Sequence, residues 1–354
     1  MILVRNIRLP LSAGEPQAFE KALREARIPR AKVQHLGVAK LSVDARRGQP
    51  KLVYTVAVTL KNEAEEPAFA GASANVSLHS RTDFRVQRGT QKLPHRPVVC
   101  GLGPAGLFAA LLLARQGYRP IVLERGPALD ERVQAVEHFS ATGELDPNAN
   151  IQFGEGGAGT FSDGKLTTRV NDPMMAEILQ LFVDAGAPEN ILYEHKPHVG
   201  TDKLRAMVQG ISRRIAELGG SVRYDAHVVD LDIKNNAVQG VILDGGERLA
   251  AGAVVLACGH SARDTYAMLA RRGVGIVAKP FAIGVRIEHP QALVDSIQYH
   301  CRERGEYLPA ASYSLVSQEG GRGVYSFCMC PGGFIVPAMT DAAQSVVNGM
   351  SPSL

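Results

Sequence analysis

Residues 97–125 read PVVCGLGPAGLFAALLLARQGYRPIVLER, and this stretch determines which fold the chain can adopt. An apolar run at 98–100 leads into the pattern Gly-x-Gly-x-x-Gly, with glycines at 101, 103 and 106. Apolar residues then recur at helical spacing, and a second apolar run at 121–123 is followed by Glu124. A strand, a glycine turn, a helix, a strand and an acid in this order are typical of the βαβ unit that binds dinucleotides.

Each residue of this turn has an expected role. Gly101 allows the tight turn, Gly103 lets the backbone approach a pyrophosphate, and Gly106 lets the helix lie close to the strands. Free N–H groups at the start of the helix would then meet the phosphates. We assign Pro104 and Ala105, which open the helix, to the same cofactor-binding set.

The acid at the end of the second strand narrows the choice of dinucleotide. Glu124 falls 23 residues after Gly101, where a carboxylate accepts hydrogen bonds from a ribose diol and repels a 2′-phosphate. This favours FAD or NAD over NADP, and we include the adjacent Arg125 in the set. A plain βαβ unit with a glycine turn is the alternative, but it would not require an acid at this position.

The composition is that of an ordinary globular protein with two or three domains. Of the 354 residues, 45% are hydrophobic and 21% are charged. No apolar run approaches the roughly 20 residues that span a bilayer, and Arg5 and Arg8 interrupt any signal-peptide core, so we expect a cytoplasmic protein. The five cysteines suit reduced thiols better than disulfides, and no pair of CxxC motifs indicates a metal site.

The first 95 residues are expected to form a basic α+β domain. Its predicted elements are a strand at 2–11, a helix at 15–28, two strands around the turn at 46–50 and a strand at 76–86. Residues 1–97 carry 17 Lys and Arg against 8 Asp and Glu, whereas the remainder carries 22 against 27. This charge is typical of a solvated face or of a surface docked on the acidic remainder, and nucleic acid is the alternative partner.

A second glycine-rich run, QFGEGGAGTFSDGKLTTR at 152–169, is the most unusual stretch of the chain. Glycines let backbone pass close to a flat or phosphorylated ligand, and the polar side chains among them supply contacts. We place this run against the cofactor and assign to the binding set Gly156, Gly157, Gly159 and Lys165. A disordered surface loop is the alternative, against which the apolar Phe153, Phe161 and Leu166 indicate a packed loop.

The rest of the second half reads as alternating helices and strands. The pattern predicts helices at 128–139, 173–185 and 201–218, a three-strand pattern at 221–224, 226–233 and 238–243, and an apolar strand at 253–258. A further helix runs to Arg271, and Ser261 and Asp264 have capping-box spacing at its start.

Three segments, 98–124, 222–243 and 247–259, resemble the signatures of FAD-containing oxidoreductases of the glutathione reductase and p-hydroxybenzoate hydroxylase type. The resemblance implies an α/β fold with an FAD/NAD(P)-binding Rossmann-like domain. It also implies that Val228 offers its backbone to the adenine, and that Ala257 and Gly259 form the strand-end signature beside the cofactor. Cys258 replaces the threonine that this signature usually contains.

Four stretches, QFGEGGAGTFSDGKL, ACGHSARDTYAML, FAIGVRIEHPQ and SFCMCPGGFIV, are similar to a narrower group. This group consists of FAD-dependent dehydrogenases of undefined substrate with a basic N-terminal extension, and the resemblance covers the whole chain. It implies an FAD-dependent oxidoreductase that acts on a small-molecule substrate. No second glycine motif between a strand and a helix follows Gly106, so we expect no full nicotinamide domain and leave NAD(P)H as a transient electron donor.

Candidates for catalysis come from two predicted strands, 281–288 and 325–330, that would shape a pocket beside the flavin. Arg286 could bind an anionic substrate, although a solvated strand face is the alternative. Cys328 and Cys330 point the same way from one strand and could exchange electrons as a dithiol, with core packing as the alternative. His260, directly after the strand-end glycine, is the remaining candidate.

We therefore predict a basic α+β domain at 1–95, an FAD-binding dinucleotide domain with inserted helices at 96–275, and a partial, β-rich substrate subdomain at 276–354. In the resembled family the chain returns to the flavin domain after the substrate region. Nothing after Gly333 matches that return, so we expect a chain that is C-terminally truncated relative to its family. Two alternatives stay open: a flavin-assisted RNA-modifying or RNA-binding protein, and a non-catalytic protein that keeps the flavin fold.

Overall fold

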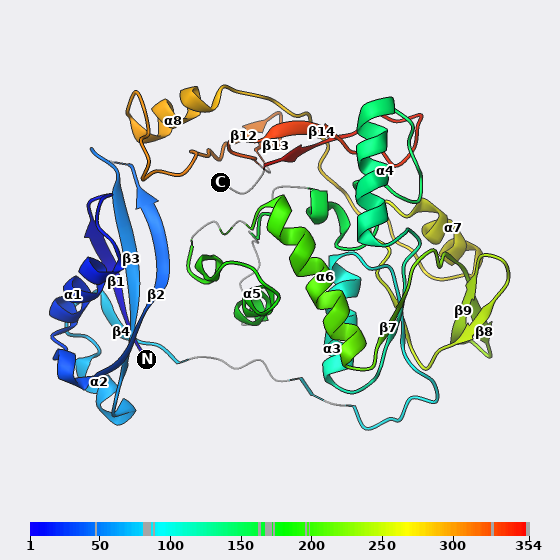
Figure 1. Ribbon diagram of the computed structural model, residues 1–354, viewed down its shortest axis with the longest axis horizontal. Helices are drawn as coiled ribbons and strands as arrows, with labels where there is room; N and C mark the ends of the chain where they lie inside the picture. The colour runs from blue at the N-terminus through cyan, green and yellow to red at the C-terminus, as the bar shows by residue number, and fades with distance from the viewer. Residues whose placement is uncertain are drawn as a thin grey trace.

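The structure is a computed structural model that describes residues 1–46, 48–80, 86–87, 89–161, 164–166, 172, 174–194, 197, 199–326 and 329–351. Figure 1 shows an N-terminal sheet, in blue, at one end of the molecule and a second α/β body that contains α3 and α6 at the other. A C-terminal segment, in orange and red, extends between the two.

The N-terminal part is an antiparallel sheet covered by one helix. Its strands are β1 (Ile2–Leu9), β2 (Val33–Asp44), β3 (Lys51–Leu60) and β4 (Val76–Leu78), in the order β2-β3-β1-β4. Helix α1 (Glu15–Ala26) packs on the sheet, and η1 (Arg30–Lys32), η2 (Glu63–Glu65) and α2 (Glu66–Phe69) lie in the connections. Every second residue of β3 from Tyr54 to Leu60 is buried, which confirms the predicted period of two. The strand predicted at 76–86 is shorter, and residues 81–85 of it lie outside the described residues.

The first glycine-rich stretch forms the predicted βαβ unit. Strand β5 (Val98–Cys100), helix α3 (Pro104–Arg115) and strand β6 (Ile121–Leu123) follow one another, and the two strands pair in parallel. Strands β7 (Ser221–Arg223) and β11 (Val254–Leu256) complete a parallel sheet in the order β11-β5-β6-β7. The chain is thus a mixed α/β protein with a parallel sheet, as predicted.

This parallel sheet is the middle layer of three. Side chains alternate along β5, so Val99 enters the core beneath α3 and α6 (Thr201–Glu217), whereas Val98 and Cys100 enter the core on the opposite face. An antiparallel sheet covers that opposite face together with α7 (Arg263–Arg271). Its strands, in the order β10-β9-β8, are β10 (Arg248–Ala250), β9 (Ala237–Leu243) and β8 (Val228–Lys234). The three strands predicted after residue 220 are therefore divided between two sheets, because β7 joins the parallel one.

Between β6 and α6 the chain forms α4 (Leu129–Thr142), η3 (Gly157–Phe161), α5 (Met174–Asp184) and η4 (Glu189–Leu192). The C-terminal part contains α8 (Gln291–Tyr299) and two separate hairpins, β12 (Val316–Glu319) with β13 (Arg322–Tyr325) and β14 (Phe334–Pro337) with β15 (Val347–Met350). These hairpins lie within residues 276–354, for which the sequence predicts a substrate subdomain.

The strands predicted at 281–288 and 325–330 do not form over their described residues, and residues 327–328 lie outside these. Residues 274–290 form neither helix nor strand, and Phe281, Ile283 and Val285 are 86%, 90% and 87% exposed. Alternation alone favours a strand, but a strand needs a neighbour for its N–H and C=O groups, and no described segment pairs with this one. Strand β13 ends at Tyr325, and Cys330 instead lies in a turn, where its carbonyl accepts the Gly333 N–H at 3.0 Å.

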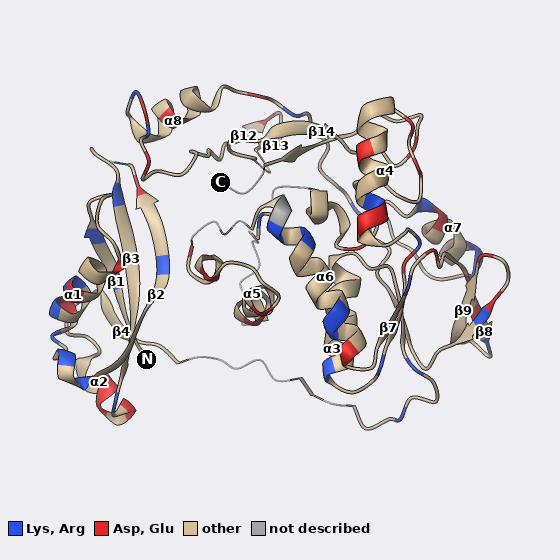
Figure 2. Cartoon of the chain, viewed as in Figure 1, with Lys and Arg blue, Asp and Glu red and all other residues tan. Residues whose placement is uncertain are grey.

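Among the described residues, the N-terminal part contacts the rest of the chain through β2 and near Leu11. The Leu41 N–H of β2 donates to the Tyr193 carbonyl at 2.8 Å. Leu11 and Val43 pack against an apolar cluster around Tyr299 of α8. Figure 2 shows acidic residues interspersed with the basic ones at both ends of the molecule. Within the N-terminal part, Lys32 pairs with Glu65 at 2.6 Å, so some of the basic residues have local acidic partners.

Candidate functional site

Two of the three motif glycines are required by the protein's own packing. Gly101 has φ +98°, and a Cβ there would lie 2.6 Å from the Ala257 carbonyl oxygen. A Cβ at Gly106 would overlap the Gly101 carbonyl oxygen. Only glycine therefore lets β5, the turn, α3 and the end of β11 come this close, as the sequence predicts.

Gly103 differs, because a Cβ added there would meet no protein atom within 4 Å. This residue precedes the first turn of α3 with φ −66°, a conformation open to any residue. No described side chain caps the helix, and Pro104 at its first position has no N–H to satisfy. The helix N-terminus thus presents uncapped N–H donors next to open space, which is the cradle that a pyrophosphate requires.

Glu124 lies beneath this turn and is only 4% exposed. One carboxylate oxygen accepts the Leu102 N–H at 2.8 Å, and the other accepts the Gly126 N–H at 2.9 Å. Burial raises the pKa of this carboxyl, while the two backbone hydrogen bonds oppose the shift. The acid therefore holds the glycine turn in place, a role that the sequence did not reveal. A carboxylate has about four lone-pair positions, so capacity remains for a ribose diol.

The second glycine-rich run packs directly on the first. The Gly156 N–H donates to the Leu102 carbonyl at 2.9 Å. Gly157 has φ +63°, and a Cβ there would lie 2.7 Å from Cδ of Pro104. Gly159 lies in η3, close to Leu204 of α6. The structure thus joins two loops that are about 50 residues apart in the sequence, on the side of the sheet where α3 begins.

Arg132, in the first turn of α4, shapes this second loop. Its side chain is fully buried, and its guanidinium donates to four main-chain carbonyls. These acceptors are Asn150 (2.9 Å from Nε), Glu155 (2.8 Å from Nη1), Ile151 (3.0 Å from Nη2) and Gly157 (3.2 Å from Nη2). Burial lowers the pKa of Arg132 to about 10, and the charges of Glu124 and Glu155 oppose that shift. Sequence reasoning missed this residue because α4 reads as a polar helix.

Glu155 ties the same loop to two helices. Its side chain is buried and accepts the Leu129 N–H at the start of α4 and the Ser212 hydroxyl of α6. Burial, together with the Glu155 carboxylate, raises the pKa of the nearby Tyr224 phenol. Loop, α4 and α6 therefore form one connected polar core behind the glycine turn.

A polar cluster lies at the end of β6, beyond Glu124. The Arg125 guanidinium donates to Asn148 at 2.7 Å and pairs with Asp264 at 2.8 Å, and His227 contacts the same Asp264 oxygen at 3.1 Å. The predicted capping box is therefore wrong: α7 begins at Arg263 after an N-cap at Ala262 with no side-chain cap, and Asp264 faces Arg125 instead. Desolvation would raise the pKa of Asp264, but its hydrogen bond to the Thr265 N–H and its contact with Arg125 lower it overall.

The strand-end residues also lie at the turn. The Ala257 N–H donates to the Cys100 carbonyl at 2.8 Å, and Gly259 has φ +78°. Val228 is half-buried at the start of β8, next to His227 of the polar cluster. Burial raises the pKa of the Cys258 thiol, and it raises that of Cys100 to about 12, so both thiols stay protonated near neutral pH.

The structure brings together two of the proposed catalytic residues, Arg286 and Cys330. His260 is exposed after the turn at Gly259. Arg286 donates to the Asn348 side chain at 2.6 Å, and the Lys165 ammonium lies 3.5 Å from the Cys330 sulfur. Lys165, predicted to bind the cofactor, is thus next to Cys330, and a Cβ at Gly349 would lie within 4.0 Å of both Cys330 and Arg286. Cys328 lies outside the described residues, so the dithiol hypothesis stays a prediction.

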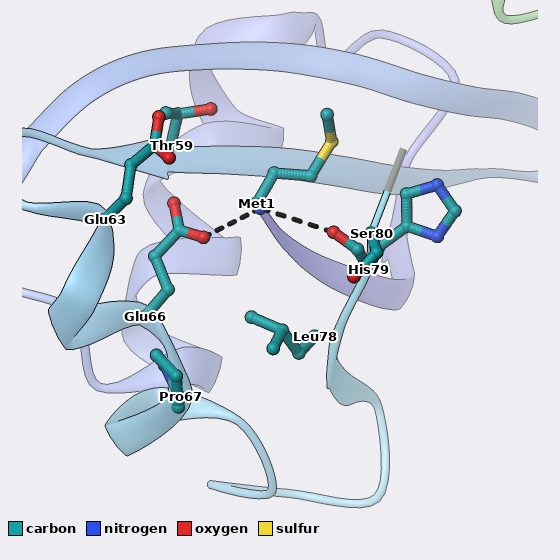
Figure 3. A pocket seen from close by; sticks show the side chains of 8 residues that line it. All are labelled: Met1, Thr59, Glu63, Glu66, Pro67, Leu78, His79 and Ser80. Carbon is teal, nitrogen blue, oxygen red and sulfur yellow. Dashed lines mark hydrogen bonds and ion pairs between the residues drawn. The ribbon is translucent and has the colours of Figure 1, made fainter. Parts of the chain in front are cut away.

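The structure also contains a pocket away from the predicted site residues. A pocket in the N-terminal part is lined by Met1, Thr59, Glu63, Glu66, Pro67, Leu78, His79 and Ser80, and Figure 3 shows the Met1 amino group turned toward Glu66. None of the predicted site residues lines it. Among the described residues no cluster of His, Cys, Asp and Glu could hold a metal ion, and no described helix is long and apolar enough to cross a membrane.

Comparison with known proteins relates the chain to FAD-dependent proteins. Residues 280–354 match the family described as "FAD-dependent protein, C-terminal domain-like", and residues 1–59 match a domain of unknown function. A protein of Clostridium beijerinckii described as uncharacterized is 42% identical over 354 residues. The match covers 99% of this chain and 66% of that relative, so the chain spans just under two thirds of the relative's length.

The solved structures that resemble parts of the chain include the following two. THI4 of Thermovibrio ammonificans is 18% identical with a TM-score of 0.36, over 51% of this chain and 64% of that one. The deglycating enzyme fructosamine oxidase of Aspergillus fumigatus is 17% identical with a TM-score of 0.34, over 49% of each chain.

Proposed function

We propose that this chain is an FAD-dependent oxidoreductase that acts on a small-molecule substrate. The observation that carries the proposal is the uncapped N-terminus of α3, which faces open space at Gly103 and is backed by the buried Glu124. The match of residues 280–354 to FAD-dependent proteins supports FAD over NAD as the dinucleotide.

The residues at the turn fit the ADP half of FAD. The N–H groups at the start of α3 would bind the pyrophosphate, and Glu124 would accept the ribose hydroxyls through its remaining lone pairs. Val228 would present backbone to the adenine near Arg125. Gly156 and Gly157, which pack on the same turn, would keep side chains out of the phosphate site. Bound FAD would supply the two-electron chemistry, while the protein binds, orients and desolvates the reacting groups.

Two glycine substitutions test this assignment. Gly103→Val and Gly275→Val each add a Cβ that meets no protein atom within 4 Å, and Gly275 lies in an exposed segment without positive φ. We expect both variants to fold, because neither added Cβ collides with a protein atom. Only Gly103→Val should abolish FAD binding, because its side chain would occupy the pyrophosphate site. FAD affinity is measured by flavin fluorescence titration. Unchanged affinity in Gly103→Val would refute the site.

A further inference from the structure

The buried guanidinium of Arg132 serves the loop more than the helix that carries it. All four of its described hydrogen bonds go to carbonyls of residues 150–157, and none goes to α4. Gly154 has φ +101°, and a Cβ there would lie 2.8 Å from both Cδ and Nε of Arg132. The loop therefore wraps around this one side chain.

Burial of the Arg132 guanidinium costs free energy, because a charge that is removed from water loses its hydration. Partial compensation comes from Glu124 and Glu155, whose charges favour the protonated guanidinium. The face of the Phe161 ring lies 4.8 Å from the guanidinium carbon and adds a cation–π contact. The planar guanidinium has a structural role that can offset this cost, because it fixes the positions of four carbonyl groups at once.

The shape that Arg132 imposes is transmitted to the glycine turn. The carbonyls of Glu155 and Gly157 flank Gly156, whose N–H donates to Leu102. The Leu102 N–H in turn donates to Glu124. Contacts thus run without a gap from Arg132 through the loop to the start of α3.

We propose that Arg132 is a positioning residue for the cofactor site, holding residues 150–157 in the one conformation that lets Gly156 and Gly157 pack on the turn at Leu102–Pro104. This inference rests on the proposed function, because the site that it positions is that of the FAD pyrophosphate. Lysine keeps the charge but has a single nitrogen, so it cannot bind all four carbonyls together.

The test compares Arg132→Lys and Gly154→Ala with the core variant Ile215→Ala. Gly154→Ala pushes the loop off the arginine without removing a charge. Ile215 is fully buried in α6, two turns beyond Val208, the residue of that helix that faces Gly156, so its truncation weakens the core away from the loop. Each protein is assayed for FAD affinity, for visible circular dichroism of bound flavin, and for amide hydrogen exchange at Gly156 without FAD.

We expect Arg132→Lys and Gly154→Ala to weaken FAD binding about tenfold or more, to change the flavin dichroism and to speed exchange at Gly156. Ile215→Ala should lower the melting temperature and leave all three unchanged. The inference is overturned if wild-type protein binds FAD and the two loop variants bind it as tightly as Ile215→Ala does. Failure of wild-type protein to bind FAD would instead refute the proposed function, and this inference with it.

Discussion

At the scale of single residues, Glu124 links the protein's own structure to the ligand expected there. Both of its oxygens accept backbone N–H groups, and one of these belongs to Leu102 inside the glycine turn. An acid at this position therefore stabilises the turn before any ribose arrives. The sequence predicts the acid from its spacing, but only the structure shows this second role.

Replacing Glu124 with Gln should lower the free energy of unfolding by about 1–3 kcal/mol at neutral pH. The amide has one acceptor oxygen, so one backbone N–H would face an NH₂ group instead of an acceptor. Chemical denaturation of the two proteins measures the difference. A variant as stable as wild type would show that the turn does not depend on this carboxylate.

The same pair of proteins should respond differently to pH. Burial raises the pKa of Glu124, so the folded protein binds this proton at a higher pH than the unfolded chain does. The stability of wild type relative to Glu124→Gln should therefore rise as pH falls through the raised pKa, and level off below the ordinary glutamate range. A difference that shrinks on acidification would contradict the direction of the shift.

At the scale of elements, the close approach of α3 to β5 positions the helix N-terminus. Gly106 makes this approach possible, because any Cβ there would overlap the Gly101 carbonyl oxygen. By contrast, a Cβ added at Gly103, three residues earlier, would meet no protein atom within 4 Å. The motif thus combines a glycine that the packing requires with one that the packing does not require, as the proposed pyrophosphate site would explain.

Gly106→Ala should accordingly destabilise the protein by about 1–3 kcal/mol, the usual penalty for overpacking, whereas Gly103→Ala should leave stability unchanged. Thermal melts of both variants without FAD make the comparison. Equal melting temperatures for the two would mean that α3 can shift at no cost and that the observed packing is not enforced.

At the scale of the whole molecule, residues 274–290 are exposed throughout. They lack regular structure, and Ile283 and Val285 point almost entirely into solvent. These residues lie at the start of the region that matches FAD-dependent proteins. Exposed apolar side chains of this density attract other apolar surfaces.

The double substitution of Ile283 and Val285 by Ser should therefore reduce binding of a hydrophobic dye without lowering the melting temperature. Side chains that are 90% and 87% exposed contribute no buried apolar area to the fold. A large loss of stability would mean that the segment is packed in the protein in solution.

The sequence predicted what depends on local spacing. The glycine turn, α3, the strands on either side and the buried alternation of β3 all follow from residues within about one element of each other. The prediction of a strand at 281–288 was wrong, because alternation of apolar and polar residues does not specify a partner strand. The role of Arg132 could not be predicted, because its partners are main-chain carbonyls and every residue has one. Lys165 contacts Cys330, which lies 165 positions later in the sequence, and no local sequence pattern predicts such a contact.

Titration of the wild-type protein with FAD and, separately, with FMN tests the central claim most directly. In the proposed site, the residues around the glycine turn would hold the pyrophosphate and the adenosine of FAD, and FMN lacks the AMP part of this group. We predict saturable binding of FAD, with an affinity at least about tenfold above that for FMN, because the pyrophosphate and ribose contacts are charged or charge-assisted hydrogen bonds. Absence of FAD binding, or equal affinity for the two flavins, would contradict the account.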